Sequence, residues 1–195
     1  LSMQTNIAIN NTKPVVLKVY SPTDVRLEMN ETSKLVVDNY TCNKFDVVSN
    51  NTSKVNINNL NCDVFLARAN NTGTIESEKI VTNKVDVNSD VSGKFKLFGI
   101  DSKLVNIKGE SASDSYFGGD TEKLVIVSKN AGDINAFDLP TKICNFTLIS
   151  SGSIYVNVTE KIEGKLSGSG DIHIKGGVST ENIVNTGTGE IIPEP

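Results

Sequence analysis

The chain has 195 residues and a formal net charge of −4, with 37% hydrophobic and 22% charged residues and no Trp. This composition is sufficient for one folded domain with a core of Val, Ile and Leu, and it excludes a disordered charged tail. Only Arg26 and Arg68 are arginines, which argues against a nucleic-acid-binding surface. Asn occurs 23 times and Ala is scarce, which excludes a helical bundle.

The first part of the chain is predicted to be a strand–turn–strand cap. Residues 15–20 and 24–29 alternate as strands do, and Ser21-Pro22-Thr23 between them is a turn sequence. A stack of repeats needs atypical ends to protect its open edges. We therefore expect a single domain over residues 1–195, with a cap at 1–32, stacked coils at 33–192 and a tail at 193–195, where proline cannot donate to a sheet.

Two interleaved series of short segments repeat along the rest of the chain. In the second series a small residue, often followed by Gly, precedes an alternating strand, as in Ser92-Gly93, Ser151-Gly152 and Ser169-Gly170. Each unit of about ten residues is a short strand followed by a polar turn. In the first series a lysine precedes the strand and recurs every 19 or 20 residues, as Lys84, Lys103, Lys123, Lys142 and Lys161.

This period predicts an all-β fold, a parallel β-solenoid with 19–20 residues and two strands per coil. Strands this short are stable only when stacked, in about eight coils roughly 4.8 Å apart. Alternation points Ile172 and Ile174 inward, Gly suits corners that need positive φ or close backbone approach, and Asn suits the other corners. An antiparallel sandwich is the alternative, although it requires no sequence repeat. The lysines of the first series are expected to stack along one edge, where they form either a solvated corner or a row that holds an acidic polysaccharide.

The C-terminal segments carry the most specific motif. Residues 150–156, 161–176 and 186–192 contain Ser-Gly-Ser-Gly-Asp-Ile or a variant of it, and Asn-Thr-Ser or Asn-Thr-Gly takes its place between residues 30 and 110. These repeats resemble the bacterial "putative auto-transporter adhesin, head GIN domain" family, whose function is unknown. The resemblance implies a β-solenoid exported to the envelope or cell surface, with adhesion as its suggested role and no catalytic residues to carry over.

The chain offers few residues for chemistry, and no catalytic, metal-binding or cofactor-binding residue and no cofactor are predicted. His173 is the only histidine and lies between two inward residues, so it is expected to face solvent. Residues 167–171 are similar to a phosphate-binding glycine loop, but they lead into a strand. Calcium-binding nonapeptide repeats need a nine-residue period, which is absent. Asp133 and Asp171 occupy the same repeat position two coils apart and are not expected to pair.

The three cysteines, Cys42, Cys62 and Cys144, include no C-x-x-C motif, which argues against structural zinc and thioredoxin-like chemistry. Cys42 and Cys62 are one coil apart and could stack within the Cα separation of a disulfide. Two free thiols are the other interpretation, because regular stacking seldom gives the Cβ geometry of a disulfide.

The chain contains no apolar run long enough for a transmembrane segment. We expect an extracytoplasmic protein (at the cell surface, in the outer envelope or in the periplasm) from which a signal segment has been removed. The predicted function is a non-catalytic adhesin or ligand-binding surface module whose partner is a glycan or an envelope protein. A structural module of the cell envelope and a polysaccharide-active solenoid enzyme are the alternatives; the enzyme would cluster acidic residues with Arg or Ca²⁺ on one face.

Overall fold

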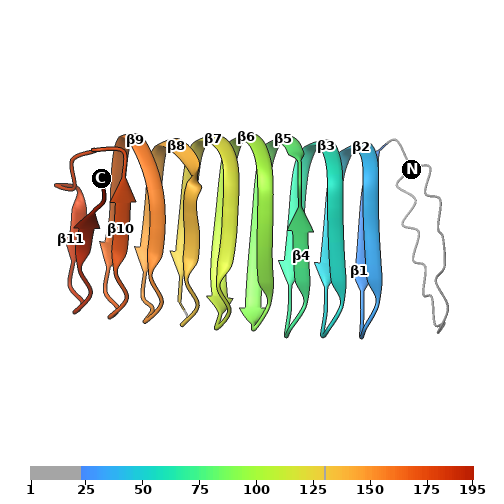
Figure 1. Cartoon of the computed structure of the whole chain (residues 1–195), viewed down its shortest axis with the longest axis horizontal. Helices are drawn as coiled ribbons and strands as arrows, with labels where there is room; N and C mark the ends of the chain where they lie inside the picture. The colour runs from blue at the N-terminus through green and yellow to red at the C-terminus, as the bar shows by residue number, and fades with distance from the viewer. Residues whose placement is uncertain (1–22, 130) are drawn as a thin grey trace.

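The computed structural model describes residues 23–129 and 131–195, and all regular structure in this part of the chain is β. The strands join in one sheet that winds as a solenoid of about eight turns (Figure 1). The strands are β1 Asp24–Met29, β2 Lys34–Ser49, β3 Lys54–Ala69, β4 Thr74–Ser77, β5 Ile80–Val91, β6 Lys94–Ser111, β7 Ser115–Ser128, β8 Ile134–Leu148, β9 Ile154–Leu166, β10 Ile172–Lys175, β11 Ile183–Asn185 and β12 Ile191–Pro193.

All pairing between successive coils is parallel. Most partners lie 20 or 19 residues apart, as for Phe45 and Phe65, and a few lie 18 apart, as for Ile154 and Ile172. The predicted parallel β-solenoid is therefore confirmed, and the antiparallel sandwich is wrong. The physical reason is the repeat itself, which brings equivalent apolar residues of each coil above one another.

Each coil is a flattened loop with two layers. The long strands cross from the first layer to the second at a bend, which lies along the upper edge in Figure 1, and the chain returns through a tight turn at the lower edge. At the bend the ladder of partners is interrupted, since Cys42 pairs with Cys62 and Lys44 with Val64, but the residues between them do not pair. The tight turns are closed by bonds such as Gly73 N–H to the Asn70 carbonyl at 2.9 Å.

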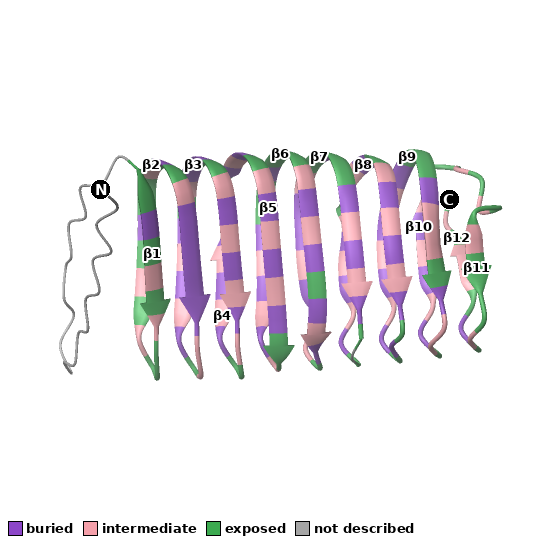
Figure 2. Ribbon diagram, turned by 180° about the vertical axis from the view of Figure 1, so that it is seen from behind, coloured by how far each residue is buried: buried purple, intermediate pink, exposed green. Residues whose placement is uncertain are grey.

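The core is a set of columns, each made of the same inward position in successive coils. Phe45 stacks on Phe65 and Phe95 on Phe117, each with ring centroids 6.3 Å apart. The alternation of buried and partly exposed residues forms bands along the strands in Figure 2. Ile172 and Ile174 are 0% and 3% exposed, so their predicted inward orientation is confirmed. Burying one such side chain stabilises the fold by about 1.5–3 kcal/mol.

The abundance of Asn is explained by ladders of side-chain amides on the outside of the coils. Asn71 Nδ2 donates to Asn51 Oδ1 at 2.9 Å, and Asn59 Nδ2 donates to Asn39 Oδ1 at 3.0 Å. In each ladder the donor lies one coil after the acceptor. A hydrogen bond of this kind contributes about 1 kcal/mol, so the ladders support the stacking that the apolar columns drive.

Glycine at the tight turns is required by close approach of the coils. A Cβ on Gly170 would lie 2.1 Å from the carbonyl oxygen of Gly152 in the preceding coil, where no side chain fits. The φ angle of Gly170 is not in the left-handed region, so of the two reasons expected for glycine, close backbone approach applies here.

The two ends of the described chain continue the stack. The strand expected at residues 15–20 lies outside the described residues, whereas 24–29 forms β1 and pairs in parallel with the second half of β2. At the other end β12 includes Pro193, and Glu194 N–H still donates to the Ile174 carbonyl at 2.8 Å. Pairing therefore extends beyond residue 192, because Pro193 lies on an edge strand where its missing N–H is tolerated.

Candidate functional site

His173 points outward from β10, as alternation predicts, but it is not a free surface residue. Its ring stacks on Tyr155 of the preceding coil, with centroids 4.5 Å apart and planes 12° from parallel. Its Nδ1 lies 2.7 Å from Glu194 Oε1, just beyond β12. Partial burial and the nearby Asp133 and Asp171 raise the pKa of Tyr155. Since Tyr155 and His173 cover each other's faces, this cluster joins the last coils rather than offering a platform for a ligand.

Asp133 and Asp171 lie two coils apart, as the sequence predicts, and Ser153 occupies the same position in the coil between them. Asp133 Oδ1 accepts from Ser153 N–H at 2.7 Å, and Asp171 Oδ1 accepts from Glu190 N–H at 2.8 Å. Asp114 likewise accepts from Asp133 N–H at 3.0 Å. Each of these carboxylates therefore accepts a hydrogen bond from the backbone N–H that immediately precedes a first-layer strand of the next coil. Sequence analysis missed Asp114 because no glycine precedes it in its coil.

The predicted stack of five lysines along one edge is wrong. Lys103 and Lys142 fall one residue before the column that contains the other three. Register is set by the buried second-layer column, in which Val85 pairs with Val105 at a spacing of 20, whereas Lys84 and Lys103 are 19 apart. The continuous row of five lysines that was expected to hold an acidic polysaccharide is therefore not formed. The column in register order is Lys84, Leu104, Lys123, Ile143 and Lys161.

A groove of about 420 Å³ crosses the outside of the bend over four successive coils, those of β3, β5, β6 and β7. We call it the bend groove. It is rich in carboxylate, amide and hydroxyl groups and contains no aromatic residue. Its lining residues are Asn61, Cys62, Asp63, Val81, Thr82, Asn83, Asp101, Ser102, Lys103, Asp120 and Glu122.

Small polar side chains that point inward form the floor of the bend groove. Thr82 Oγ1 contacts the carbonyl oxygen of Lys84 at 3.2 Å, and Ser102 Oγ donates to Thr121 Oγ1 at 3.1 Å. Cys62 Sγ lies 3.7 Å from Thr82 Oγ1. These contacts provide hydrogen-bond partners for polar groups at the bend, where the strand ladder is interrupted. The bend can therefore recur in successive coils without leaving those groups unsatisfied.

The rim of the bend groove is acidic. Asp101 and Asp120 are register partners on neighbouring strands, and both side chains are exposed. Within residues 23–129 and 131–195 no hydrogen bond or ion pair satisfies either carboxylate. Like charges directly opposite each other on adjacent strands destabilise a sheet. The fold itself therefore gives no reason for this pair, which sequence analysis did not identify because no motif marks the two residues.

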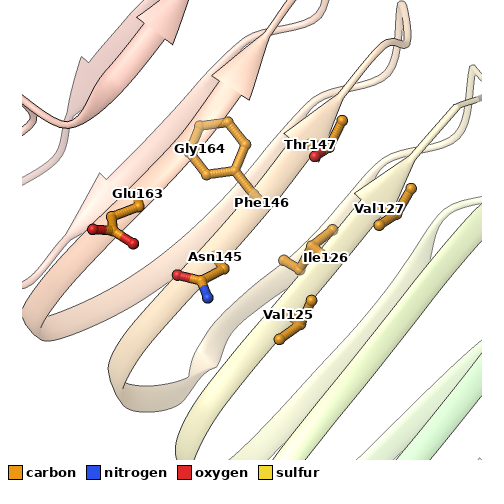
Figure 3. Close-up of a pocket in the computed structure, with 8 residues that line it drawn as sticks. All are labelled: Val125, Ile126, Val127, Asn145, Phe146, Thr147, Glu163 and Gly164. Carbon is orange, nitrogen blue, oxygen red and sulfur yellow. The ribbon is translucent and has the colours of Figure 1, made fainter.

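A second, smaller depression of about 230 Å³ lies on the second layer over β7, β8 and β9 (Figure 3). It exists because Gly164 has no side chain, and the ring of Phe146 lies 2.3 Å from where its Cβ would be. Outward side chains of mixed character, Val125, Asn145 and Glu163 among them, surround it. Its polar groups do not converge on one point, so it is a weaker candidate for a binding site than the bend groove.

In residues 23–129 and 131–195, no three His, Cys, Asp or Glu side chains are grouped so that they could hold a metal ion. Nor does that part of the chain contain a helix with the length and hydrophobicity needed to cross a membrane.

Comparison with known proteins supports the resemblance found in the C-terminal motifs. The family model described as "putative auto-transporter adhesin, head GIN domain" matches residues 68–177, more than half of the chain. The match extends from the last residues of β3 past β10 and includes most of the bend groove. A search of the curated proteins finds no match. This β-solenoid belongs to the head GIN domain family of "putative auto-transporter adhesins".

Proposed function

We propose that this protein is a non-catalytic, extracytoplasmic adhesin module that binds a hydroxyl-rich glycan along the bend groove. The family to which it belongs is named for surface adhesion, which supports both the location and the role. The single-domain division, with a cap at 1–32, coils at 33–192 and a tail at 193–195, stays a prediction.

The observation that carries this proposal is the pair Asp101 and Asp120. They are register partners on adjacent strands and both are exposed, and within the described part of the chain neither carboxylate has a hydrogen-bond or ion-pair partner. Like charges in this arrangement destabilise the sheet. Sugar hydroxyl groups would donate hydrogen bonds to both, and a hydrogen bond to a charged acceptor is about twice as strong as a neutral one.

The shape of the bend groove favours a polymer over a small ligand. The groove crosses four coils spaced about 4.8 Å apart, and each coil contributes polar side chains at its bend. Asn61, Asn83 and Lys103 add donors beside the carboxylates, so a chain with repeated hydroxyl groups can be held at several points. Several weak contacts on one rigid surface add up to useful affinity.

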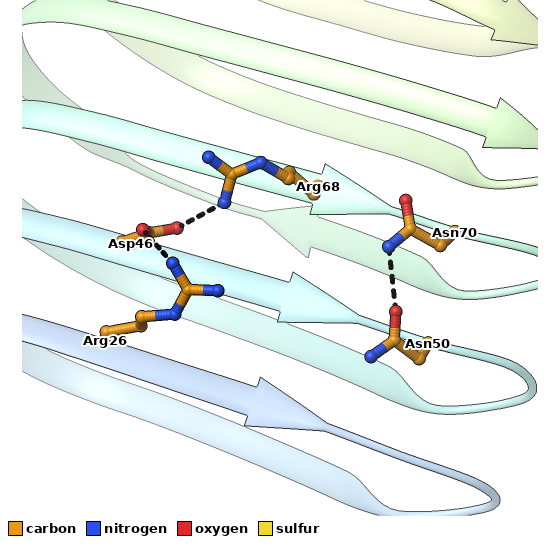
Figure 4. Close-up of polar contacts among 5 residues, drawn as sticks. All are labelled: Arg26, Asp46, Asn50, Arg68 and Asn70. Atoms are coloured by element: carbon orange, nitrogen blue, oxygen red, sulfur yellow. Dashed lines mark hydrogen bonds and ion pairs between the residues drawn. The ribbon is translucent and has the colours of Figure 1, made fainter. Parts of the chain in front are cut away.

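The placement of the arginines supports a non-catalytic role. Both Arg26 and Arg68 contact Asp46, at 3.2 and 3.1 Å (Figure 4). Asp46 lies on the second layer, away from the bend groove, and its side chain is 8% exposed. These two residues therefore belong to a structural contact, whereas the predicted enzyme alternative would cluster acidic residues with Arg or Ca²⁺ on one face.

A glycan array tests the proposal. The parent protein is expected to bind a subset of glycans, and Asp101→Asn/Asp120→Asn is expected to weaken that binding at least about tenfold, or ~1.4 kcal/mol. Glu160→Gln/Glu181→Gln removes the same formal charge from exposed positions outside the groove and is expected to bind normally. Binding of no glycan, or equal loss in both double variants, would overturn the glycan proposal. Release of reducing sugar from a bound polysaccharide would overturn the non-catalytic role.

A further inference from the structure

Cys42 and Cys62 are direct neighbours at the bend of two successive coils. They are register partners on β2 and β3, and they are 6% and 5% exposed. Adjacent strands lie about 4.7–4.9 Å apart, which falls within the Cα separation of about 4.4–6.8 Å that a disulfide accepts.

The bend provides the adjustment that a regular strand would resist. A disulfide needs its Cβ atoms somewhat closer than the strand spacing, at about 3.5–4.5 Å. Immediately after the two cysteines the ladder is interrupted, since Asn43 and Asp63 are not partners and pairing resumes only at Lys44. The backbone on this side of the cysteines is therefore less constrained than in the middle of a strand.

We propose that Cys42 and Cys62 are a redox-active pair that forms an intramolecular disulfide and thereby joins the coils of β2 and β3 covalently. The oxidant is a small disulfide such as oxidised glutathione, or the disulfide of a thiol–disulfide oxidoreductase. The Cys62 thiolate attacks one sulfur of the oxidant and releases the other as a thiol. The Cys42 thiolate then attacks Cys62 Sγ in the mixed disulfide and releases the second thiol. Two protein thiols lose two electrons and two protons, and one disulfide oxidant is reduced to two thiols.

The surroundings of the two sulfurs favour this order of attack. Both cysteines are largely buried, but Cys62 lines the bend groove, from which an oxidant would approach, and Cys42 does not. The side-chain contacts with Cys42 and Thr82 lower the pKa of Cys62. The contact with Cys62 and burial raise the pKa of Cys42. The first attacking group is therefore the Cys62 thiolate at the groove, and the Cys42 thiol resolves the mixed disulfide.

The position of the pair gives the bond a mechanical consequence. Terminal coils of a solenoid have a neighbour on one side only and open first. A bond between residues 20 apart closes one full coil near the N-terminal end of the described stack and restricts the unfolded chain. In the later coils this column contains Thr82, Ser102 and Thr121. Their hydroxyl groups still make polar contacts at the bend, as between Ser102 and Thr121, but they cannot form a disulfide.

The test uses the full chain, first reduced and then equilibrated with mixtures of reduced and oxidised glutathione. Thiol titration after denaturation should fall from three free thiols to one, and peptide mapping should find Cys42 linked to Cys62 and Cys144 unmodified. The melting temperature should rise on oxidation and return on addition of dithiothreitol. Retention of three thiols with excess oxidised glutathione, or linkage through Cys144 or between chains, would overturn the proposal.

Two variants test the order of attack. Cys42→Ser leaves the attacking sulfur without its resolving partner and should accumulate one glutathione on Cys62. Cys62→Ser should react with glutathione at least about tenfold more slowly, because the remaining thiol at the bend does not line the groove. Serine occupies the same column as Ser102, so both variants are expected to fold. Faster glutathionylation of Cys62→Ser than of Cys42→Ser would reverse the assigned roles. The outcome does not depend on whether the bend groove binds a glycan.

Discussion

Asn71 and Val91 occupy the same corner of successive coils, and both have a left-handed backbone, with φ of 56° and 58°. Asn51, one coil earlier, has φ of 54°. Asparagine tolerates this region, whereas a β-branched residue is strained there by about 1–2 kcal/mol. Val91 is 53% exposed, so its side chain recovers little of that cost by burial. The backbone of the repeat thus requires a left-handed conformation at this corner, and valine is poorly suited to it.

Replacing Val91 with Asn should stabilise the protein. The expected gain is about 1 kcal/mol in the free energy of unfolding, from relief of backbone strain and extension of the amide ladder that now ends at Asn71. Urea denaturation measures it. The reverse change in the previous coil, Asn71→Val, is the matched control and should cost about 1 kcal/mol or more. A destabilised Val91→Asn variant would show that the valine side chain contributes packing which its exposure does not reveal.

Residues 172 and 173 should differ sharply in their tolerance of substitution. Ile172→Asp puts an unpaired carboxylate between two stacked coils and should cost about 3 kcal/mol or more. For His173→Ala, the sequence alone predicts a loss under about 0.5 kcal/mol, typical of a surface residue. The stack on Tyr155 and the contact with Glu194 raise our expectation to about 1 kcal/mol. Thermal melts of both variants decide this; equal losses would mean that the strand faces are assigned incorrectly.

The contact of Asp46 with two arginines should be cooperative. Arg26→Met or Arg68→Met alone leaves one partner for the buried carboxylate and should cost about 1 kcal/mol, because both arginines are partly exposed (Figure 4). The double variant leaves the carboxylate without a cation and should cost about 3 kcal/mol. Adding Asp46→Asn removes the buried charge and should restore at least half of that loss. Strictly additive single effects in denaturant titrations would contradict a shared contact.

Cys144 should make the fold sensitive to alkaline pH. The thiol is fully buried among apolar residues, and this burial raises its pKa to about 12 from the usual value of 9.0. Because the folded pKa is the higher one, the contribution of the neutral thiol is complete below about pH 9. It falls between pH 9 and 12, by up to about 1.4 kcal/mol per pH unit.

The measurement is urea denaturation of the parent and of Cys144→Val at about pH 8, 9 and 10, a range that spans the titration of an ordinary thiol. Valine occupies this column in β5 and β6, as Val85 and Val105. The variant should lose less stability than the parent as pH rises, while lysine and tyrosine titration affects both equally. Parallel curves would show that ionisation of Cys144 does not contribute. Cys144→Ser should be destabilised at every pH, because it buries a hydroxyl among apolar side chains.

Much of the fold could be predicted from the sequence because the repeat and the alternation act locally. Equivalent residues recur every 19–20 positions, so stacked coils place like residues above like, as at Phe45 and Phe65. The inward orientation of Ile172 and Ile174 followed from alternation alone. The stacking of Cys42 on Cys62 followed from their spacing of one coil.

The candidate site could be predicted only in part, because coil length varies by one or two residues. Lys84 and Lys103 share a motif but not a column, since the step from Val85 to Val105 is 20 residues. Asp101 and Asp120 carry no shared motif, yet a step of 19 makes them neighbours on the rim of the bend groove. A shift of one residue moves a side chain to the other face of a strand, so an average period cannot assign it.

The sequence by itself thus determined the architecture: a parallel solenoid, its period, its apolar inner rows and the family to which it belongs. Only the tertiary structure decided which polar side chains meet on the outside: the carboxylates of Asp101 and Asp120, His173 with Glu194, and Asp46 between two arginines. The physical reason is that apolar burial rewards a periodic pattern that can be detected along the chain, whereas a polar contact depends on the exact register between coils. That register is fixed by packing of the whole core.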